Sequence, residues 1–275
     1  MNLFQLIRSS FGLGGRLFPR QASHIARRLL MTPRLHPPKD WEVEAEAAAT
    51  RVHFGPGLSA LRWGTQGPIA LCVHGWEGRA SQFAGYLSPL LAAGYQVIAL
   101  DAPAHGQSSG KQAHPLSFAD AILDAGWEFG PVELVIGHSM GAGALAIAMA
   151  RGLDARRAVL IAGPSSLRNM LLRFAHFINL PPLARDYFLS LVEDYTQAPL
   201  DSVEIHQLAR NFTVPALVVH DREDRMMPYA EAQQVVSNWP DAELFSTSGL
   251  GHHRVLTDPK VIAAVTQFAR SVAAP

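Results

Sequence analysis

The sequence predicts an α/β fold: a mostly parallel central sheet with helices on both faces and a short helical cap insertion. Short apolar runs typical of buried strands alternate with segments typical of helices, which is the pattern of βαβ units. The strand-like runs are Ile69–Val73, Val97–Leu100, Leu134–Ile136, Val159–Ile161, Ala216–Val219 and Glu243–Phe245. The helical candidates lie near residues 81–93, 116–128, 140–152, 230–238 and 258–272.

Two segments depart from this alternation. Arg51–Trp63 carries Gly55-Pro56-Gly57 between two strand-like stretches, which predicts an antiparallel hairpin at the sheet edge. Ser165–Asn211 contains no good strand, and its Leu, Phe and Tyr residues predict two or three short helices. Ligands bind at the carboxyl ends of strands in open α/β sheets, so we expect this insertion, about residues 165–211, to form a lid or a substrate pocket.

The first 50 residues differ in composition from the remaining chain. Residues 1–40 hold seven basic side chains and one acidic one, a net charge of +6, whereas the other 16 basic and 22 acidic side chains give −6. Apolar residues recur there at helical spacing at Ala22, Ile25, Ala26, Leu29 and Leu30. They predict an amphipathic helix after Pro19 that ends before Pro33, with Arg27 and Arg28 on its other side.

We therefore divide the chain into a basic amphipathic N-terminal extension, residues 1–50, and an α/β domain, residues 51–275. The extension has four readings: packing on the domain, contact of residues 1–40 with an anionic membrane surface, contact with a partner or second copy, or targeting. The sequence contains no run of about 18 uncharged apolar residues, so no membrane-spanning helix is expected. We expect the chain to be cytoplasmic.

Composition excludes several classes of protein. Hydrophobic residues at 48% and charged residues at 17% are typical of a chain with a sizeable core and not of a disordered one. A formal charge of zero gives no electrostatic footprint for nucleic acid, so no nucleic-acid partner is expected. Cys72, the single cysteine, can form neither an internal disulfide nor a thiolate metal site. The 12 histidines show no HExxH or other paired spacing, so we expect no metal.

The strongest chemical signal is Gly137-His138-Ser139-Met140-Gly141. It follows a strand-like run and opens a helix-like one, which is the context of a G-x-S-x-G nucleophile elbow. The glycines remove side chains that would clash in so sharp a turn. Ser139 would then project from the sheet, and the helix N-terminus would favour a developing negative charge.

A serine nucleophile needs a base that is oriented by a carboxylate, and candidates for both follow Ser139 in the chain. Asp221, Glu223 and Asp224 come directly after one predicted strand, and His252 and His253 come after the next. Because the carboxyl ends of parallel strands meet at one edge of a sheet, both groups fall on the same edge as Ser139. Spacing alone does not choose among them.

From about residue 58 to its end, the chain resembles the α/β-hydrolase superfamily, in its esterase/lipase-like branch. Five stretches carry the resemblance in the family's order: His74-Gly75-Trp76, Asp101-Ala102-Pro103-Ala104-His105-Gly106-Gln107-Ser108, the Ser139 elbow, Asp224 to Pro228, and Gly251-His252. The resemblance implies an α/β-hydrolase fold. Ala104 departs from the pattern, because the family usually has glycine there, and a slight shift of that loop is expected.

The resemblance also implies roles for the duplicated candidates. Asp224 matches the family's acid and His252 its base, so the implied catalytic residues are Ser139, Asp224 and His252. Asp221 stands where the family has glycine and is interpreted as a turn residue that bonds its own backbone. His253 would face the pocket rim or solvent.

The family's oxyanion hole implies two backbone donors here, the N–H groups of Met140 and Trp76. The ring of Trp76 would also line the acyl pocket. Asp101 and His105 are interpreted as parts of a structural turn, and His74 and His138 as orienting or packing groups. Cys72, inside an apolar strand, is expected to be buried and inert.

The implied function is that of a serine hydrolase, which cleaves a carboxylic ester or related acyl bond through an acyl-enzyme intermediate. A thioesterase, amidase, lactonase or carbon–carbon bond hydrolase could use the same triad. A non-catalytic ligand-binding protein on this scaffold is the alternative from another class. The expected partner is a small acyl substrate, apolar because of the composition of Ser165–Asn211. We expect no cofactor, since such a triad supplies its own acid–base and covalent chemistry.

Overall fold

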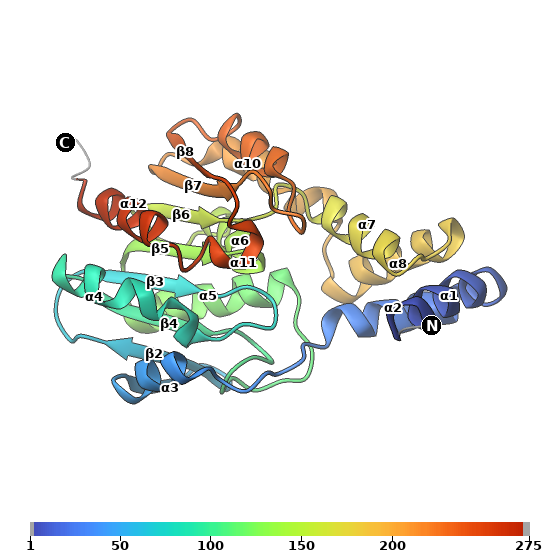
Figure 1. Cartoon of the computed structure of the whole chain (residues 1–275), viewed down its shortest axis with the longest axis horizontal. Helices are drawn as coiled ribbons and strands as arrows, with labels where there is room; N and C mark the ends of the chain where they lie inside the picture. The colour runs from blue at the N-terminus through green and yellow to red at the C-terminus, as the bar shows by residue number, and fades with distance from the viewer. Residues whose placement is uncertain (1–2, 272–275) are drawn as a thin grey trace. The chain divides into compact units, whose positions relative to one another are not determined.

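The computed structural model describes residues 3–271, and within them the chain forms two compact units (Figure 1). The first unit comprises Met1–Thr32 and Ser166–Glu204, and the second comprises Pro33–Ser165 and Ile205–Pro275. We call them the helical unit and the sheet unit. The N-terminal helices therefore associate with part of the segment inserted between two strands of the sheet unit.

The sheet unit is built on one eight-stranded sheet, in the order β1-β2-β4-β3-β5-β6-β7-β8. Its strands are β1 Thr50–Phe54, β2 Leu58–Trp63, β3 Ile69–Val73, β4 Gln96–Asp101, β5 Val132–His138, β6 Ala158–Ile161, β7 Ala216–Asp221 and β8 Ala242–Thr247. The pairs β1–β2 and β2–β4 are antiparallel, and all the others are parallel. Both the mostly parallel sheet and the antiparallel β1–β2 pair predicted for Arg51–Trp63 at its edge are confirmed.

Helices cover both faces of this sheet. One layer contains α3 Asp40–Ala47, η1 Ala80–Phe83, α4 Ala84–Ala92 and α12 Pro259–Arg270, and the other contains α5 Pro115–Phe129, α6 Met140–Ala150, α9 Ile205–Leu208, η3 Ala209–Asn211 and α10 Tyr229–Val236. Alternate strand residues point to opposite layers. Thus Ala70 and Cys72 of β3 belong to the core beneath the first layer, whereas Leu71 and Val73 point the other way.

The helical unit consists of α1 Leu3–Leu17, α2 Pro19–Met31, α7 Leu167–Phe177, α8 Pro182–Thr196 and the short η2 Leu200–Val203. Its core combines residues from both of its chain segments, including Phe11 and Ala26 from the first and Phe188 and Val192 from the second. Because each segment buries its apolar side chains against the other, neither has a complete core alone.

Helix α2 begins at Pro19 and ends before Pro33, as its spacing predicted, but its apolar stripe is only partly buried. Ala26 is buried, whereas Ile25 and Leu29 are 60% and 47% exposed. The helix turns its Ser23 side toward α8, where the Ser23 hydroxyl lies 2.6 Å from the carbonyl oxygen of Ala184. Arg27, expected on the outer side, lies over the ring of Tyr195. The small residues Ala22, Ser23 and Ala26 allow α2 to lie close to α8. This contact determines which side of α2 is buried.

Candidate active site

Ser139, His252 and Asp224 form one hydrogen-bonded chain in the sheet unit, at the carboxyl ends of β5, β7 and β8. The Ser139 hydroxyl lies 2.9 Å from Nε2 of His252, and Nδ1 of His252 lies 2.7 Å from Oδ2 of Asp224. All three side chains are buried. The carboxylate only accepts, so Nδ1 of His252 carries the proton, and Nε2 is left to accept the proton of the serine hydroxyl.

The turn that carries Ser139 is strained and tightly packed. Ser139 has a φ of 53° and a ψ of −119°, a left-handed backbone value that L-residues rarely adopt. A Cβ at Gly141 would lie 2.4 Å from the carbonyl oxygens of Val73 and His74, and one at Gly137 would lie 2.6 Å from the Cα of Ala142. Both glycines therefore allow the start of α6 to pack against neighbouring backbone, which holds the serine at the tip of the turn.

Asp224 is held as a charged acceptor. Its Oδ1 accepts the backbone N–H groups of Met226 and Met227 at 2.8 and 2.9 Å, while Oδ2 faces His252. Burial raises the pKa of this carboxyl, but the hydrogen bonds from His252, Met227 and Met226 outweigh it and leave the pKa below its usual value. Asp224 therefore favours a proton on Nδ1 of His252.

His252 is also fixed through its own backbone. Its carbonyl oxygen lies 3.0 Å from Nε2 of His138, so that nitrogen is the donor. Burial, together with the nearby ring of His252, lowers the pKa of His138 to about 3. His138 therefore stays neutral at ordinary pH and orients the α11 segment, Gly251–Arg254, that carries the base.

Two backbone donors stand beside Ser139. Met140 is the first residue of α6, and Trp76 follows Gly75 in the loop after β3. Neither N–H bonds to a protein acceptor anywhere in residues 3–271. A Cβ at Gly75 would lie 2.9 Å from the Cβ of Ser139, so this loop runs directly past the serine. The site thus offers two unpaired donors near the serine, one of them at the positive end of a helix.

The loop after β3 is held by two neutral histidines. His74 donates from Nδ1 to the Gly75 carbonyl at 2.7 Å and accepts from the Ala102 N–H at 3.0 Å. Burial, chiefly, lowers the pKa of His74 to about 3 and also lowers that of His105. His105 accepts the N–H of Glu77 at 3.0 Å, next to Trp76 in the chain. The ring of Trp76 is half-buried and lies edge-on to that of His105.

The turn after β4 supports the same loop through Asp101. Its carboxylate accepts the backbone N–H groups of Ala80 and Gln107 and an N–H of Arg51, at 2.8 to 3.1 Å. Ala104 adopts a φ of 63°, a left-handed conformation that glycine adopts without strain, so the departure at this position leaves the turn intact. The interpretation of Asp101 and His105 as parts of a structural turn agrees with these bonds.

Asp221 is buried and does not contact His252. Its Oδ1 accepts the N–H of Glu223, as expected of a turn residue, but its Oδ2 also accepts the Thr247 hydroxyl at 2.7 Å and the Leu250 N–H at 3.0 Å. Burial raises the pKa of Asp221, and these hydrogen bonds lower it further than burial raises it. Sequence reasoning missed the second set of contacts, since the partners lie 26 and 29 residues away.

The remaining candidates stay outside the triad. Glu223 and His253 are exposed. Cys72 is fully buried in β3, and burial raises the pKa of its thiol, so the reactive thiolate is disfavoured. Within the part of the chain that the structure describes, no helix is long and apolar enough to cross a membrane.

Known proteins resemble this chain over most of its length. A model of the alpha/beta hydrolase family matches residues 70–265. The monoacylglycerol lipase of Mycolicibacterium smegmatis is 25% identical over 233 residues, which cover 70% of this chain and 83% of that protein. The 2-hydroxy-6-oxononadienedioate/2-hydroxy-6-oxononatrienedioate hydrolase 1 of Dechloromonas aromatica is 28% identical over 230 residues, 66% of this chain and 78% of that one.

Solved structures support the fold. An esterase from Pyrococcus furiosus superposes with a TM-score of 0.63 at 19% identity, over 86% of this chain and 96% of that chain. At this identity the likeness concerns the fold alone. Together with the family match, it confirms the expected α/β-hydrolase architecture of the sheet unit.

Proposed function

Because the chain belongs to the alpha/beta hydrolase family, we propose that it is a serine hydrolase that cleaves a carboxylic ester by way of an acyl-enzyme. The observation that carries this proposal is the continuous chain from the Ser139 hydroxyl through His252 to Asp224, with contacts of 2.9 and 2.7 Å. Such a chain activates a serine for attack on an acyl carbon.

The reaction divides into two acyl transfers. Oγ of Ser139 attacks the ester carbonyl while its proton moves to Nε2 of His252, and Asp224 stabilises the imidazolium that forms. The N–H groups of Met140 and Trp76 receive the charge on the carbonyl oxygen. When the intermediate collapses, the alcohol leaves with the proton from His252. Water then attacks the acyl-enzyme and gives a proton to His252. When this second intermediate collapses, the bond to Oγ of Ser139 breaks, Oγ takes the proton back from His252, and the acid is released.

The proposed substrate is an ester with an apolar acyl group. The lipase name of one relative supports ester cleavage, and the aromatic and aliphatic composition of residues 165–211 supports an apolar acyl group. One relative is named a hydrolase of 2-hydroxy-6-oxononadienedioate, a compound whose name contains no ester, and this makes carbon–carbon bond cleavage by the same triad the second candidate. The proposed partner is therefore a small acyl substrate. We propose no cofactor for the reaction.

The test is an activity screen with a matched serine control. Wild type, Ser139→Ala and Ser202→Ala are assayed on p-nitrophenyl esters of increasing acyl length, on thioesters, on lactones and on a carbon–carbon hydrolase substrate. We expect ester hydrolysis by the wild type and by Ser202→Ala, whose serine lies on the exposed surface, and its loss in Ser139→Ala. Equal activity of Ser139→Ala and wild type would exclude the proposal, and preference for another bond type would replace the ester.

A further inference from the structure

The α1–α2 segment, Leu3–Met31, carries an unusual concentration of exposed apolar side chains; we call it the hairpin. The exposed apolar residues are Leu6, Leu13, Leu17, Phe18, Ile25 and Leu29, with exposures of 47% to 64%. On α1 the three leucines stand seven and four residues apart, which places them in one stripe on the helix surface. On α2, Ile25 and Leu29 form a second stripe, and Phe18 stands at the turn between the helices.

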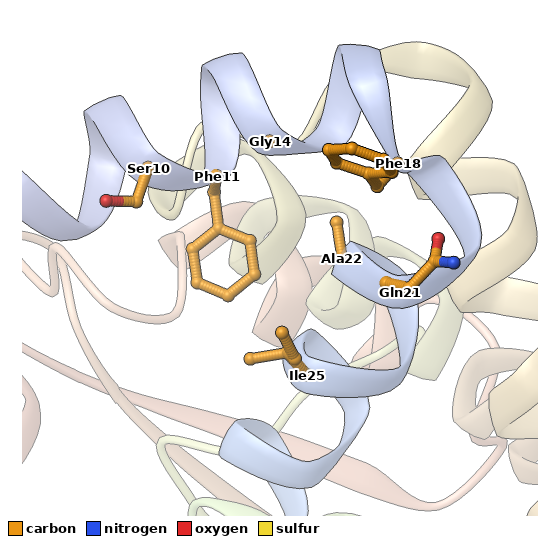
Figure 2. A pocket seen from close by; sticks show the side chains of 7 residues that line it. All are labelled: Ser10, Phe11, Gly14, Phe18, Gln21, Ala22 and Ile25. Atoms are coloured by element: carbon orange, nitrogen blue, oxygen red, sulfur yellow. The ribbon is translucent and has the colours of Figure 1, made fainter.

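An apolar groove of about 390 Å³ runs between the two helices (Figure 2). Phe11 points into it from α1, and Ala22 and Ile25 point into it from α2, as Figure 2 shows. Gly14 contributes no side chain, and a Cβ built there would meet no atom within 4 Å. The groove is open to the surface, so a flexible apolar chain can enter it.

All charged side chains of the hairpin are positive. Leu3–Met31 contains five arginines and no acidic residue. Arg8 and Arg27 face α7 and α8, where Arg8 donates to the Phe177 carbonyl and Arg27 lies over Tyr195. Arg16 and Arg28 are exposed and form no ion pair within residues 3–271. By helical spacing each lies about 80° from the apolar stripe of its helix, at the edge of the apolar surface.

We propose that the hairpin docks the protein onto an anionic lipid bilayer. Apolar side chains of amphipathic helices enter the boundary between headgroups and acyl chains, while flanking arginines reach the lipid phosphates. The leucine, isoleucine and phenylalanine side chains fit the first role, and Arg16 and Arg28 fit the second. The groove between α1 and α2 accommodates an acyl chain of a lipid in the outer part of the bilayer.

A second copy of the chain fits this surface less well. A two-fold contact places the same patch on both partners, so the arginines of both copies would gather at one interface with no acidic residue of the hairpin to pair them. An anionic bilayer, in contrast, supplies the charge that the hairpin lacks. The inference concerns binding alone and does not depend on the proposed hydrolysis.

The experiment measures binding of the full chain to vesicles by co-flotation. Vesicles of phosphatidylcholine alone are compared with vesicles that contain about 30 mol% phosphatidylglycerol, at low and high salt. The apolar variant is Leu13→Asp/Leu17→Asp, with Trp127→Asp as its control, because Trp127 is an 88% exposed apolar residue of α5 in the sheet unit. The charge variant is Arg16→Glu/Arg28→Glu, with Arg156→Glu/Arg270→Glu, two exposed arginines of the sheet unit, as its control.

We expect binding to the phosphatidylglycerol vesicles that weakens at high salt. Both hairpin variants should bind at least roughly tenfold more weakly, while the two controls bind as the wild type does. Circular dichroism and gel filtration verify that each variant is folded. Absence of vesicle binding by the wild type, or equal loss in the hairpin variants and their controls, would overturn the proposal. So would a wild-type dimer that Leu13→Asp/Leu17→Asp dissociates without any effect on vesicles.

Discussion

Oδ2 of Asp221 accepts the backbone N–H of Leu250 at 3.0 Å and so fastens the segment that leads into His252. The same oxygen accepts the Thr247 hydroxyl at the end of β8. The carboxylate does not touch His252, whereas that of Asp224 does. Two aspartates three residues apart thus have different tasks: Asp224 bonds the ring of the base, and Asp221 holds the loop on which the base stands.

These different roles predict different losses of activity when each aspartate is replaced by asparagine. Asp224→Asn should lower kcat about a thousandfold or more on an ester, because the wrong tautomer of His252 is favoured. Asp221→Asn should lower kcat/KM only about tenfold and reduce thermal stability, because the amide keeps one acceptor oxygen. The pH profile of Asp221→Asn should match that of the wild type. A thousandfold loss in Asp221→Asn with a mild effect of Asp224→Asn would exchange the two assignments.

Gly75 allows the loop after β3 to lie close to the serine, because glycine has no Cβ. The Cβ of Gly75→Ala would stand 2.9 Å from the Cβ of Ser139 and 3.1 Å from Nδ1 of His138, so the loop and its Trp76 N–H must move. We expect kcat/KM to fall about 100-fold while the melting temperature changes little. Gly14→Ala, in open space on α1, is the control. An unchanged kcat/KM in Gly75→Ala would remove this loop from the oxyanion site.

Buried neutral histidines make stability depend on pH. Burial lowers the pKa of His74 and of His138 from 6.5 to about 3, so the unfolded chain binds more protons than the native state in this interval. The stability is complete above pH 6.5 and is lost as the pH falls toward 3. When the pH falls from 7.5 to 5, each of the two histidines should lower the free energy of unfolding by about 2 kcal/mol.

His138→Gln tests this dependence with one residue. Its amide can still donate to the His252 carbonyl, but it does not titrate. Urea unfolding at pH 7.5 and pH 5 should show that the difference between the two pH values shrinks by about 2 kcal/mol in the variant. If wild type and His138→Gln lose the same free energy between these pH values, burial of a neutral His138 is not the cause.

The N-terminal helices contribute core to the helical unit, and Ala26 is the sharpest probe of that contact. Ala26 is fully buried in the core of the helical unit, where α2 packs on α8, so Ala26→Asp places an unpaired carboxylate in an apolar core. The expected cost is about 3 kcal/mol or more, seen as a lower melting temperature and faster limited proteolysis. His24→Asp, at an exposed position of the same helix, is the matched control. Equal stability of the two variants would contradict the packing of α2.

The sheet and the elbow could be predicted from the sequence because their signals are local. The predicted strand Ile69–Val73 coincides with β3, and the helix predicted near 140–152 begins at Met140, directly after Ser139. Short apolar runs that alternate with helix-like segments favour strands buried on both faces of a sheet. The G-x-S-x-G pattern also specifies its own turn, since each of its glycines meets backbone at less than 3 Å once a Cβ is added.

The features that sequence reasoning missed depend on distant partners. Helix α1 was not predicted, because Gly12, Gly14 and Gly15 disfavour a helix locally. In the structure, Cβ atoms at Gly12 and Gly15 would collide with Asn179 and Pro181, so the glycines permit a contact made more than 160 residues away. The exposure of Ile25 likewise depends on which side of α2 meets α8, and no periodicity within α2 contains that information.

The central claim is that Ser139 is the nucleophile of an acyl-transfer reaction. Its most direct test is the mass of the intact protein after treatment with a fluorophosphonate, with the modified residue located by peptide sequencing. We predict a single phosphonyl adduct on Ser139 in the wild type, and no adduct in Ser139→Ala. A wild-type protein that remains unlabelled, or an adduct of equal yield in Ser139→Ala, would contradict the account.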